Sequence, residues 1–503
     1  MRWISYFSLI NTRETMKIHL IATLWMLCVL NSEAQTDTIT RHRPWLAVGE
    51  AAGINAGVWA MNRYVAHAPF AYIDFKTIRK NFRTGFVWDN DKFSTNMFLH
   101  PYHGGLYFNA FRTNGMSFGW SAAGALGGSL MWELFMETEP PSINDVLATT
   151  AGGIALGEIT FRISSSLVNY RARGLERVWR EAAITLISPV NGFNRLLRGD
   201  MWRVKPLYDA WNNEESHQTS ATLSTGTAWL SPNGKLFKGT INGFLKLKLE
   251  HGDLFSKPYS APYDFFEVQA NLTIRQQATM GDVSLLGRLW SRERESTPGK
   301  KLIWGLFQHF DYIVKDTTSN NRRQVPVQIS GAAVAGAGLI WISAPESDRL
   351  KLKTSLFVNA VLLGGTHSDY FSVLERDYNL VNGYSIKSFN AVTLGRLCRL
   401  KLNYHLMHLF TWRNKIDSLY YRTLDPHYLD VQGTQSNTLV HVIQGGCDVA
   451  FSDRLSASLD LYYYRRESRY DDFPMVTTNT LRMTLGINWW ISNPRKLTAT
   501  SML

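Results

Sequence analysis

The stretch FEVQANLTIR, residues 266–275, alternates apolar and polar side chains without interruption. Phe266, Val268, Ala270, Leu272 and Ile274 are apolar, and every residue between them is polar or charged. Because successive side chains of a β-strand point to opposite faces, the stretch predicts a strand with one apolar and one polar face. Its length suffices to cross a bilayer at a tilt.

The same alternation recurs from about residue 219 to the end of the chain. We predict about twelve strands, an even number as in bacterial outer-membrane barrels. A soluble β-sandwich is the alternative, but strands of this length exceed those usual in soluble sheets. The strands are expected at residues 219–230, 236–250, 264–276, 282–292, 301–314, 325–343, 349–363, 384–397, 399–412, 438–452, 454–464 and 478–491.

The lengths of the connections give an independent test of the barrel. If the last strand ends in the periplasm, the outward loops are 315–324, 364–383, 413–437 and 465–477, all long. The turns between them are short, an asymmetry that is typical of outer-membrane barrels. The first strands fit less well, because the outward turn at 231–234 is short and the inward connection at 251–263 is long.

The N-terminus predicts an export signal. Lys17 precedes the apolar run Ile18–Leu30, and Ser32 and Ala34 occupy the small-residue positions before a cleavage site. The run is too short to span a membrane permanently. Since a signal that begins at Met16 needs nothing upstream, we expect translation to start there.

Composition supports an envelope protein. The 503 residues are 45% hydrophobic and 13% aromatic, which is too aromatic for a disordered chain, while 19% charged residues exceed what a bundle of membrane helices carries. A net charge of +12 favours anionic surfaces. Without a run of basic residues or a nucleic-acid motif, we expect outer-membrane lipid and lipopolysaccharide as partners, with no nucleic acid.

Three segments before the barrel carry small residues four positions apart. They are residues 45–66 with Gly49, Gly53 and Gly57, residues 115–137, and residues 145–170. Residues four apart share a helix face, and small residues there let two helices approach closely. We therefore expect tightly packed helices in the barrel lumen or just beneath it, because charged residues interrupt most of these segments.

The fold class that follows is an α+β membrane protein. A small glycine-rich helical module precedes an antiparallel transmembrane β-barrel of about twelve strands. The expected division is a signal peptide at 1–34, a helical periplasmic or lumenal module at 36–200 and the barrel at 215–503.

Polar residues gather in the helical half. Ser142 and Asp145 have the spacing of a helix cap, and Glu158 and Arg162 that of a helical ion pair. Pro101 is expected to push His100 out of helical geometry into a turn. These features favour a structural polar core, and the alternative is a catalytic or metal site formed by His100, His103, Glu133, Glu137, Asp145 and Glu158.

In the catalytic interpretation the protein hydrolyses a membrane lipid or lipopolysaccharide. His103 would be the general base, His100 its partner or a metal ligand, and Glu133 or Glu137 the orienting carboxylate. No Gly-x-Ser-x-Gly elbow, P-loop or dinucleotide glycine motif is present. The sequence therefore assigns neither a serine nucleophile nor a cofactor.

The motifs HPYHGGLYFNAFRTNG and SLMWELFMETEPPSINDVLATTAGGIALGEITFR resemble a family of uncharacterised bacterial outer-membrane proteins known only as a domain of unknown function. The resemblance covers about residues 80–190. It implies a signal peptide, an envelope location and a downstream barrel, and it implies no activity or catalytic residue.

Three functions are thus open for an exported protein of the outer membrane of a Gram-negative bacterium that depends on the barrel assembly machinery. The first is a structural or transport barrel that the helical module plugs. The second is the hydrolase described above, and the third is a surface ligand-binding barrel. The third would use loops 364–383 and 413–437, with Trp412, Tyr420, Tyr421 and His427.

Overall fold

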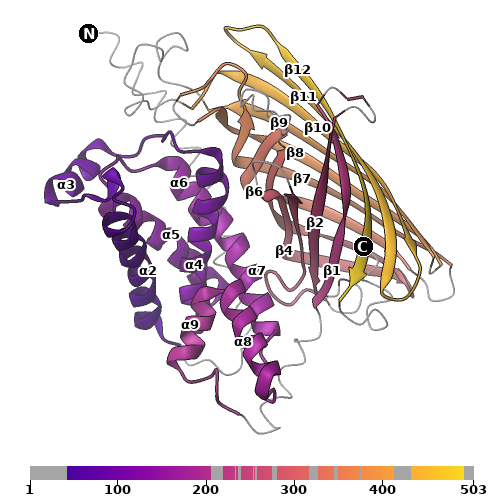
Figure 1. The fold of residues 1–503 in the computed structure, drawn as a ribbon, viewed down its shortest axis with the longest axis horizontal. Helices are drawn as coiled ribbons and strands as arrows, with labels where there is room; N and C mark the ends of the chain where they lie inside the picture. The colour runs from indigo at the N-terminus through magenta and orange to yellow at the C-terminus, as the bar shows by residue number, and fades with distance from the viewer. Residues whose placement is uncertain are drawn as a thin grey trace.

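The computed structural model shows a helical module beside a closed β-barrel (Figure 1). It describes residues 42–204 and 219–491, apart from 233, 236–238, 253, 255–257, 275–279, 316–326, 345–348, 374–375, 396 and 413–431. The expected signal peptide and Tyr420, Tyr421 and His427 lie outside the described residues.

The barrel has twelve antiparallel strands in sequence order, and β1 pairs with β12 to close it. Each predicted strand corresponds to one observed strand, so the predicted fold class is confirmed. The strands are β1 (Thr219–Ser231), β2 (Thr240–His251), β3 (Phe266–Ile274), β4 (Met280–Thr297), β5 (Lys300–Lys315), β6 (Val327–Ser343), β7 (Leu350–His367), β8 (Tyr378–Leu394), β9 (Cys398–Thr411), β10 (Ser436–Ala450), β11 (Leu455–Tyr470) and β12 (Val476–Trp490).

The helical module contains the three predicted helical segments and several further helices. Its elements are α2 (Pro44–Tyr64), η1 (Pro69–Ala71), α3 (Phe75–Thr84), η2 (Thr95–Leu99), α4 (His100–Arg112), α5 (Phe118–Phe135), α6 (Ile143–Leu147), η3 (Ala148–Gly152), α7 (Gly153–Ser166), α8 (Gly174–Ile187) and α9 (Pro189–Leu197).

The expected turn at HPYHGG is wrong, because His100 is the first residue of α4 and has helical backbone angles. Pro101 is the second residue of that helix, and Leu99 before it has helical backbone angles as well. The preceding π-helical turn η2 leads directly into it.

Charged side chains from several strands meet inside the barrel lumen. Lys387 on β8 forms an ion pair with Asp311 on β5 at 2.5 Å, and Lys401 on β9 forms one with Asp460 on β11 at 3.0 Å. These pairs join strands that are not neighbours in the sheet, so their side chains meet inside the barrel. On β5, the odd-numbered residues therefore face the lumen and the even-numbered residues face outward.

Outward-facing residues are apolar and exposed over much of the barrel. On β5 these are Trp304 and Leu306, each 38% exposed, and on β12 they are Leu485 and Ile487, 52% and 55% exposed. An exposed apolar band on a closed barrel is what a lipid-facing surface requires.

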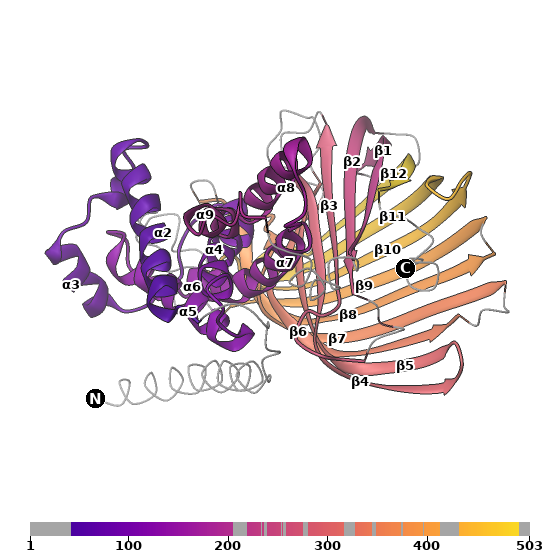
Figure 2. The ribbon, with the colours of Figure 1, turned by 90° about the horizontal axis from the view of Figure 1, so that it is seen from below.

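One sector of the outer wall is covered by the helical module instead. Phe310 and Tyr312 face outward on β5 and are buried among residues of the module. The Gln308 amide donates a hydrogen bond to the Ala151 carbonyl at 2.8 Å, and Phe93 packs against Tyr312. Both views show the helices beside the barrel (Figures 1 and 2).

The expected position of the helices in the lumen or beneath the barrel is therefore corrected. The apolar outer faces of β3, β4 and β5 supply a surface that matches the helices, whereas the lumen is occupied by charged side chains. The long connection between β2 and β3 has its reason here as well. Its Pro262 carbonyl accepts a hydrogen bond from Arg162 of α7, and Tyr263 packs against Phe118 of α5.

Close helix packing occurs between α4 and α7. A Cβ on Gly104 would lie 1.7 Å from the Thr149 carbonyl oxygen, and one on Gly153 would lie 2.5 Å from the Gly104 carbonyl carbon. The glycines of α2 behave differently, because Gly49 and Gly53 have no atom within 4 Å of an added Cβ. The close contact expected at the glycines of α2 is thus not observed. The close contact expected at the small residues of 145–170 is present at Gly153.

Candidate functional site

A polar cluster lies where the first turn of α4 meets α6 and the segment before η2. Ser142 caps α6, with its hydroxyl accepting a hydrogen bond from the Asp145 N–H at 3.2 Å, as the spacing predicted. This cap places Asp145 in the first turn of α6, where its side chain faces His100.

Two asparagines orient the carboxylates of this cluster. Asp89 Oδ1 accepts hydrogen bonds from Asn96 at 2.8 Å and from Asn144 at 2.7 Å. The same Asn144 amide donates to Asp145 Oδ1 at 2.8 Å. Asp89 and Asp145 are therefore held side by side by amide donors rather than by cations.

His100 lies near the carboxylates of Asp145 and Asp91. Its Nε2 is 3.5 Å from Asp145 Oδ1 and 3.8 Å from Asp91 Oδ2, and the atom is buried without a hydrogen bond. Burial by itself would lower the pKa of His100, but the carboxylates around it, Asp91 first, raise that pKa above its usual value. The surrounding carboxylates thus favour a positive charge at this position.

His103 faces a different set of partners. Its Nε2 lies 3.0 Å from the Tyr107 hydroxyl, which donates a hydrogen bond to Asn55 Oδ1 of α2. Burial lowers the pKa of His103 to about 3, and the neighbouring His100 adds to this shift. A neutral imidazole that links α4 to α2 through Tyr107 has a structural role, so the geometry favours His100 over His103 for chemistry.

Glu133 lies in the last turn of α5, and Glu137 lies two residues beyond the end of that helix. Burial raises the pKa of Glu133 to about 7, and burial together with Glu133 raises the pKa of Glu137. Glu133 Oε2 accepts a hydrogen bond from the Ser142 N–H at 2.8 Å. The Glu133 carboxylate thus holds the start of α6, and its charge also acts on His100.

Glu158 does not belong to this cluster. It accepts hydrogen bonds from Arg162 and Arg112, both at 2.8 Å, and its side chain is fully buried. Thirteen residues separate it from Asp145 along α6, η3 and α7, which is about 20 Å at the helical rise. The predicted Glu158–Arg162 ion pair is present.

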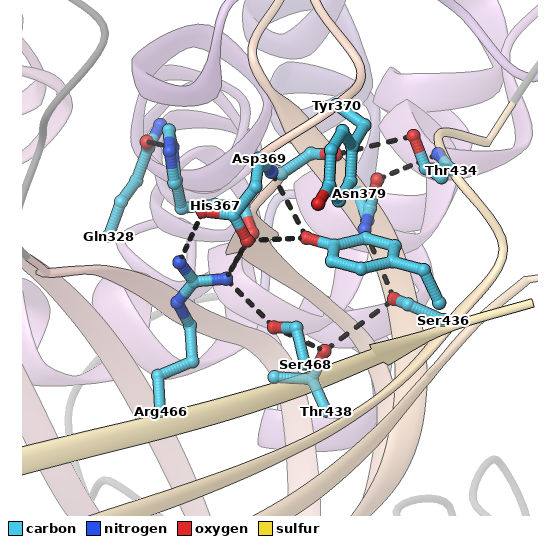
Figure 3. Close-up of polar contacts among 12 residues, drawn as sticks. Gln328, His367, Asp369, Tyr370, Asn379, Thr434, Ser436, Thr438, Arg466 and Ser468 are labelled. Atoms are coloured by element: carbon cyan, nitrogen blue, oxygen red, sulfur yellow. Dashed lines mark hydrogen bonds and ion pairs between the residues drawn. The ribbon is translucent and has the colours of Figure 1, made fainter. Parts of the chain in front are cut away.

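A second polar network joins the connection between β7 and β8 to neighbouring strands of the barrel (Figure 3). Asp369, in the connection between β7 and β8, accepts hydrogen bonds from Arg466 of β11 at 2.7 and 2.8 Å. The Tyr470 hydroxyl donates to the same carboxylate at 2.7 Å. This connection is thereby held against β11, three strands further around the barrel.

Below this network, inward-facing apolar side chains form a layer across the lumen. Its buried members are Val327, Ile329, Val334, Val361, Val381, Met407, Leu409, Val440 and Tyr464. Further along, a cavity of about 300 Å³ is lined by residues from all twelve strands, including Lys246, Glu267, Asp311, Lys387 and Lys401. Its acidic side chains include Glu267, Asp282 and Asp311 on β3, β4 and β5, and its basic side chains include Lys353, Lys387 and Lys401 on β7, β8 and β9.

Comparison with known proteins identifies the central part of the helical module. Residues 85–190 match a domain of unknown function, DUF3943. The match agrees with the resemblance found in the sequence, and the polar cluster lies within the DUF3943 domain. Among curated proteins, none matches the chain.

Several solved outer-membrane proteins are similar to the barrel. The NanC porin is 10% identical, with a TM-score of 0.28, over 53% of this chain and 98% of the porin. The channel DcaP of Acinetobacter baumannii is 8% identical, with a TM-score of 0.23, over 54% and 96%. An outer-membrane channel of Pseudomonas putida F1 is 8% identical, with a TM-score of 0.27, over 55% and 96%.

The closed barrel with an exposed apolar band makes this an outer-membrane β-barrel protein of unknown biochemical activity. Within the described residues, one helical stretch, Ile143–Ser166, is long and apolar enough to cross a membrane. More than half of its most apolar window is buried in the protein, and its first residues include Asp145.

The sequence indicated part of the site and missed the rest. It singled out His100, Asp145 and Glu133, which the structure brings together, and it did not include Asp89. The second polar network, in which Asp369 accepts hydrogen bonds from Arg466 and Tyr470, was missed; we call it the mouth network. Its signal was present in β11, where Arg466, Ser468 and Tyr470 continue the inward-facing alternation beyond the predicted end of the strand.

Proposed function

We propose that the protein is a structural outer-membrane protein whose barrel is sealed and carries the DUF3943 domain on its outer wall. The observation that carries the proposal is the mouth network, in which Arg466 and Tyr470 fix Asp369 across the end of the lumen. The apolar layer beneath it and the ion pairs of Lys387 and Lys401 add two further barriers.

This arrangement differs from a plugged barrel. The described helices lie on the outer wall, so the seal is made by strands and by the connection between β7 and β8. Removing the DUF3943 domain would therefore leave the lumen as closed as before, provided that the barrel still assembles.

The test is conductance of the full-length protein in planar lipid bilayers, together with vancomycin sensitivity of cells that express it. We expect conductance near the background of protein-free bilayers and unchanged sensitivity. A stable open-channel current from the unmodified protein would overturn the proposal.

A second function is favoured by the surroundings of His100. Leu99 at the end of η2 and Tyr102 on α4 flank the cluster and are 53% and 42% exposed, so charged groups lie beside an apolar surface. That combination suits a site for a lipid with a polar head group, such as an envelope phospholipid or lipopolysaccharide. In this candidate hydrolase, His100 and Asp145 would act as the base and its orienting carboxylate.

Mass spectrometry of lipid A and envelope phospholipids from a deletion strain tests this second function. The strain is complemented with the unmodified gene, with His100→Gln or with His103→Gln. A lipid change restored by the unmodified gene and by His103→Gln, but not by His100→Gln, supports the hydrolase. An unchanged lipid profile in the deletion strain rejects it.

A further inference from the structure

The strongest unexplained group of side chains is the one around His100. Asp89, His100 and Asp145 each contribute one ligand atom, and these three atoms lie within 4.8 Å of one another. They come from three segments of the chain: the residues before η2, the first turn of α4 and the first turn of α6. We propose that Asp89, His100 and Asp145 bind a divalent transition-metal cation of the Zn²⁺ type.

The first argument is the crowding of carboxyl groups around one imidazole. Asp89, Asp91, Glu133 and Asp145 lie around His100, and Asp145 and Glu133 are only 4% and 1% exposed. Charges buried in proteins are paired or coordinate metals. The nearby Arg376 guanidinium donates a hydrogen bond to the Asp89 main-chain carbonyl at 2.7 Å and another to Asn90 Oδ1 at 3.1 Å. A cation between the carboxylates would reduce their repulsion.

The second argument is the state of the imidazole. Nε2 of His100 is inaccessible to solvent and accepts or donates no hydrogen bond, although it points at two carboxylates. A buried ring nitrogen without a hydrogen bond is unusual, and a metal ion would use its lone pair. One imidazole nitrogen and two carboxylate oxygens form a ligand set that suits Zn²⁺ and related ions.

The third argument is the support behind the ligands. Asn144 donates to both Asp89 and Asp145, and Asn96 donates to Asp89. Metal-binding carboxylates are typically held in this way by groups that fix their orientation. Asp91 is 54% exposed next to His100 and marks a route by which an ion can enter.

This proposal does not depend on the sealed barrel, and it assigns the lone pair of His100 to a cation instead of to the general base of the candidate hydrolase. Its test is binding of Zn²⁺, and separately Mn²⁺, to the purified full-length protein in detergent after treatment with EDTA. Titration calorimetry and elemental analysis after dialysis are the measurements. We expect one equivalent of Zn²⁺ for the unmodified protein, and at least tenfold weaker binding for His100→Gln and for Asp145→Asn.

His67→Asn is the matched control, since His67 is exposed on a loop and adopts a positive φ of 50° that asparagine tolerates. It should bind Zn²⁺ like the unmodified protein. Circular dichroism checks that each variant retains its helices, and Asp89→Asn replaces any variant that does not. Absence of binding by the unmodified protein, or equal binding by the folded variants, would overturn the proposal.

Discussion

The guanidinium of Arg466 donates two hydrogen bonds to the carboxylate of Asp369 and so ties the connection between β7 and β8 to β11. In Arg466→Met the carboxylate loses both bonds, and we expect the connection to release from the mouth. Removing one partner of a largely buried ion pair costs about 3–5 kcal/mol. Conductance in planar bilayers should rise above that of the unmodified protein.

The matched control for this prediction is the neighbouring residue. Arg465 faces outward on β11, is 44% exposed and forms an ion pair with Glu467. Arg465→Met should leave conductance unchanged. Equal currents in the two variants would show that the Arg466–Asp369 pair does not hold the mouth closed.

Gly104 allows α4 and α7 to touch. In Gly104→Ala the new methyl group would collide with the Thr149 carbonyl oxygen, so the two helices must separate. We expect the free energy of unfolding of the helical module to fall by about 1–3 kcal/mol, as for overpacked sites. In Gly127→Ala the methyl group meets no atom within 4 Å, and stability should rise by up to about 1 kcal/mol. Urea unfolding followed by circular dichroism compares the two variants.

The strands could be predicted from the sequence because a period of two requires no knowledge of the partner strand. The predicted ends of the strands were less accurate. β8 begins at Tyr378 and β11 continues to Tyr470, several residues beyond the predicted ends. At the end of β11 the outward face is polar as well, as in Arg465 and Arg469, so the alternation of apolar and polar residues disappears there although the strand continues.

The position of the helical module could not be predicted in the same way. Leu306 and Phe310 lie on the same outward face of β5, yet one is exposed and the other is covered by the helices. An apolar outward residue has the same sequence signal whether lipid or a helix covers it. Within the site, His100 faces Asp145 and His103 faces Tyr107. Because a turn was expected at HPYHGG instead of the helix α4, the sequence did not predict these separate partners.

Glu158 neutralises two arginines inside the module. Glu158→Gln leaves the side chains of Arg112 and Arg162 largely buried with a weaker acceptor, and a loss of about 3–5 kcal/mol in the free energy of unfolding is expected. Glu176→Gln is the comparison, because the Glu176–Arg180 pair has the same spacing on the surface of α8. That change should cost less than about 0.5 kcal/mol. Similar losses in urea unfolding would contradict the role of Glu158.

His103 makes the stability of the module depend on pH. Its pKa is about 3 in the folded protein and 6.5 in an unfolded chain, so between these values the unfolded state binds more protons. The contribution of His103 is complete above pH 6.5 and is lost as the pH falls towards 3, with a slope of at most about 1.4 kcal/mol per pH unit. Thermal unfolding of the helices between pH 4 and 7 should be less pH-dependent in His103→Gln. An identical pH dependence in both proteins would assign the effect to other groups.

Phe310 tests the attachment of the module to the outer wall. Its ring is fully buried beneath the helices on the outward face of β5. Phe310→Asp would place an unpaired charge in that contact, which costs several kcal/mol unless water enters, so the helices should detach. The measurement is limited trypsin digestion, with faster cleavage of residues 42–204 expected while the barrel keeps its heat-modifiable migration in gels. Phe310→Leu keeps the site apolar and should be digested like the unmodified protein. Cleavage at the same rate in Phe310→Asp would mean that this face of β5 does not hold the module.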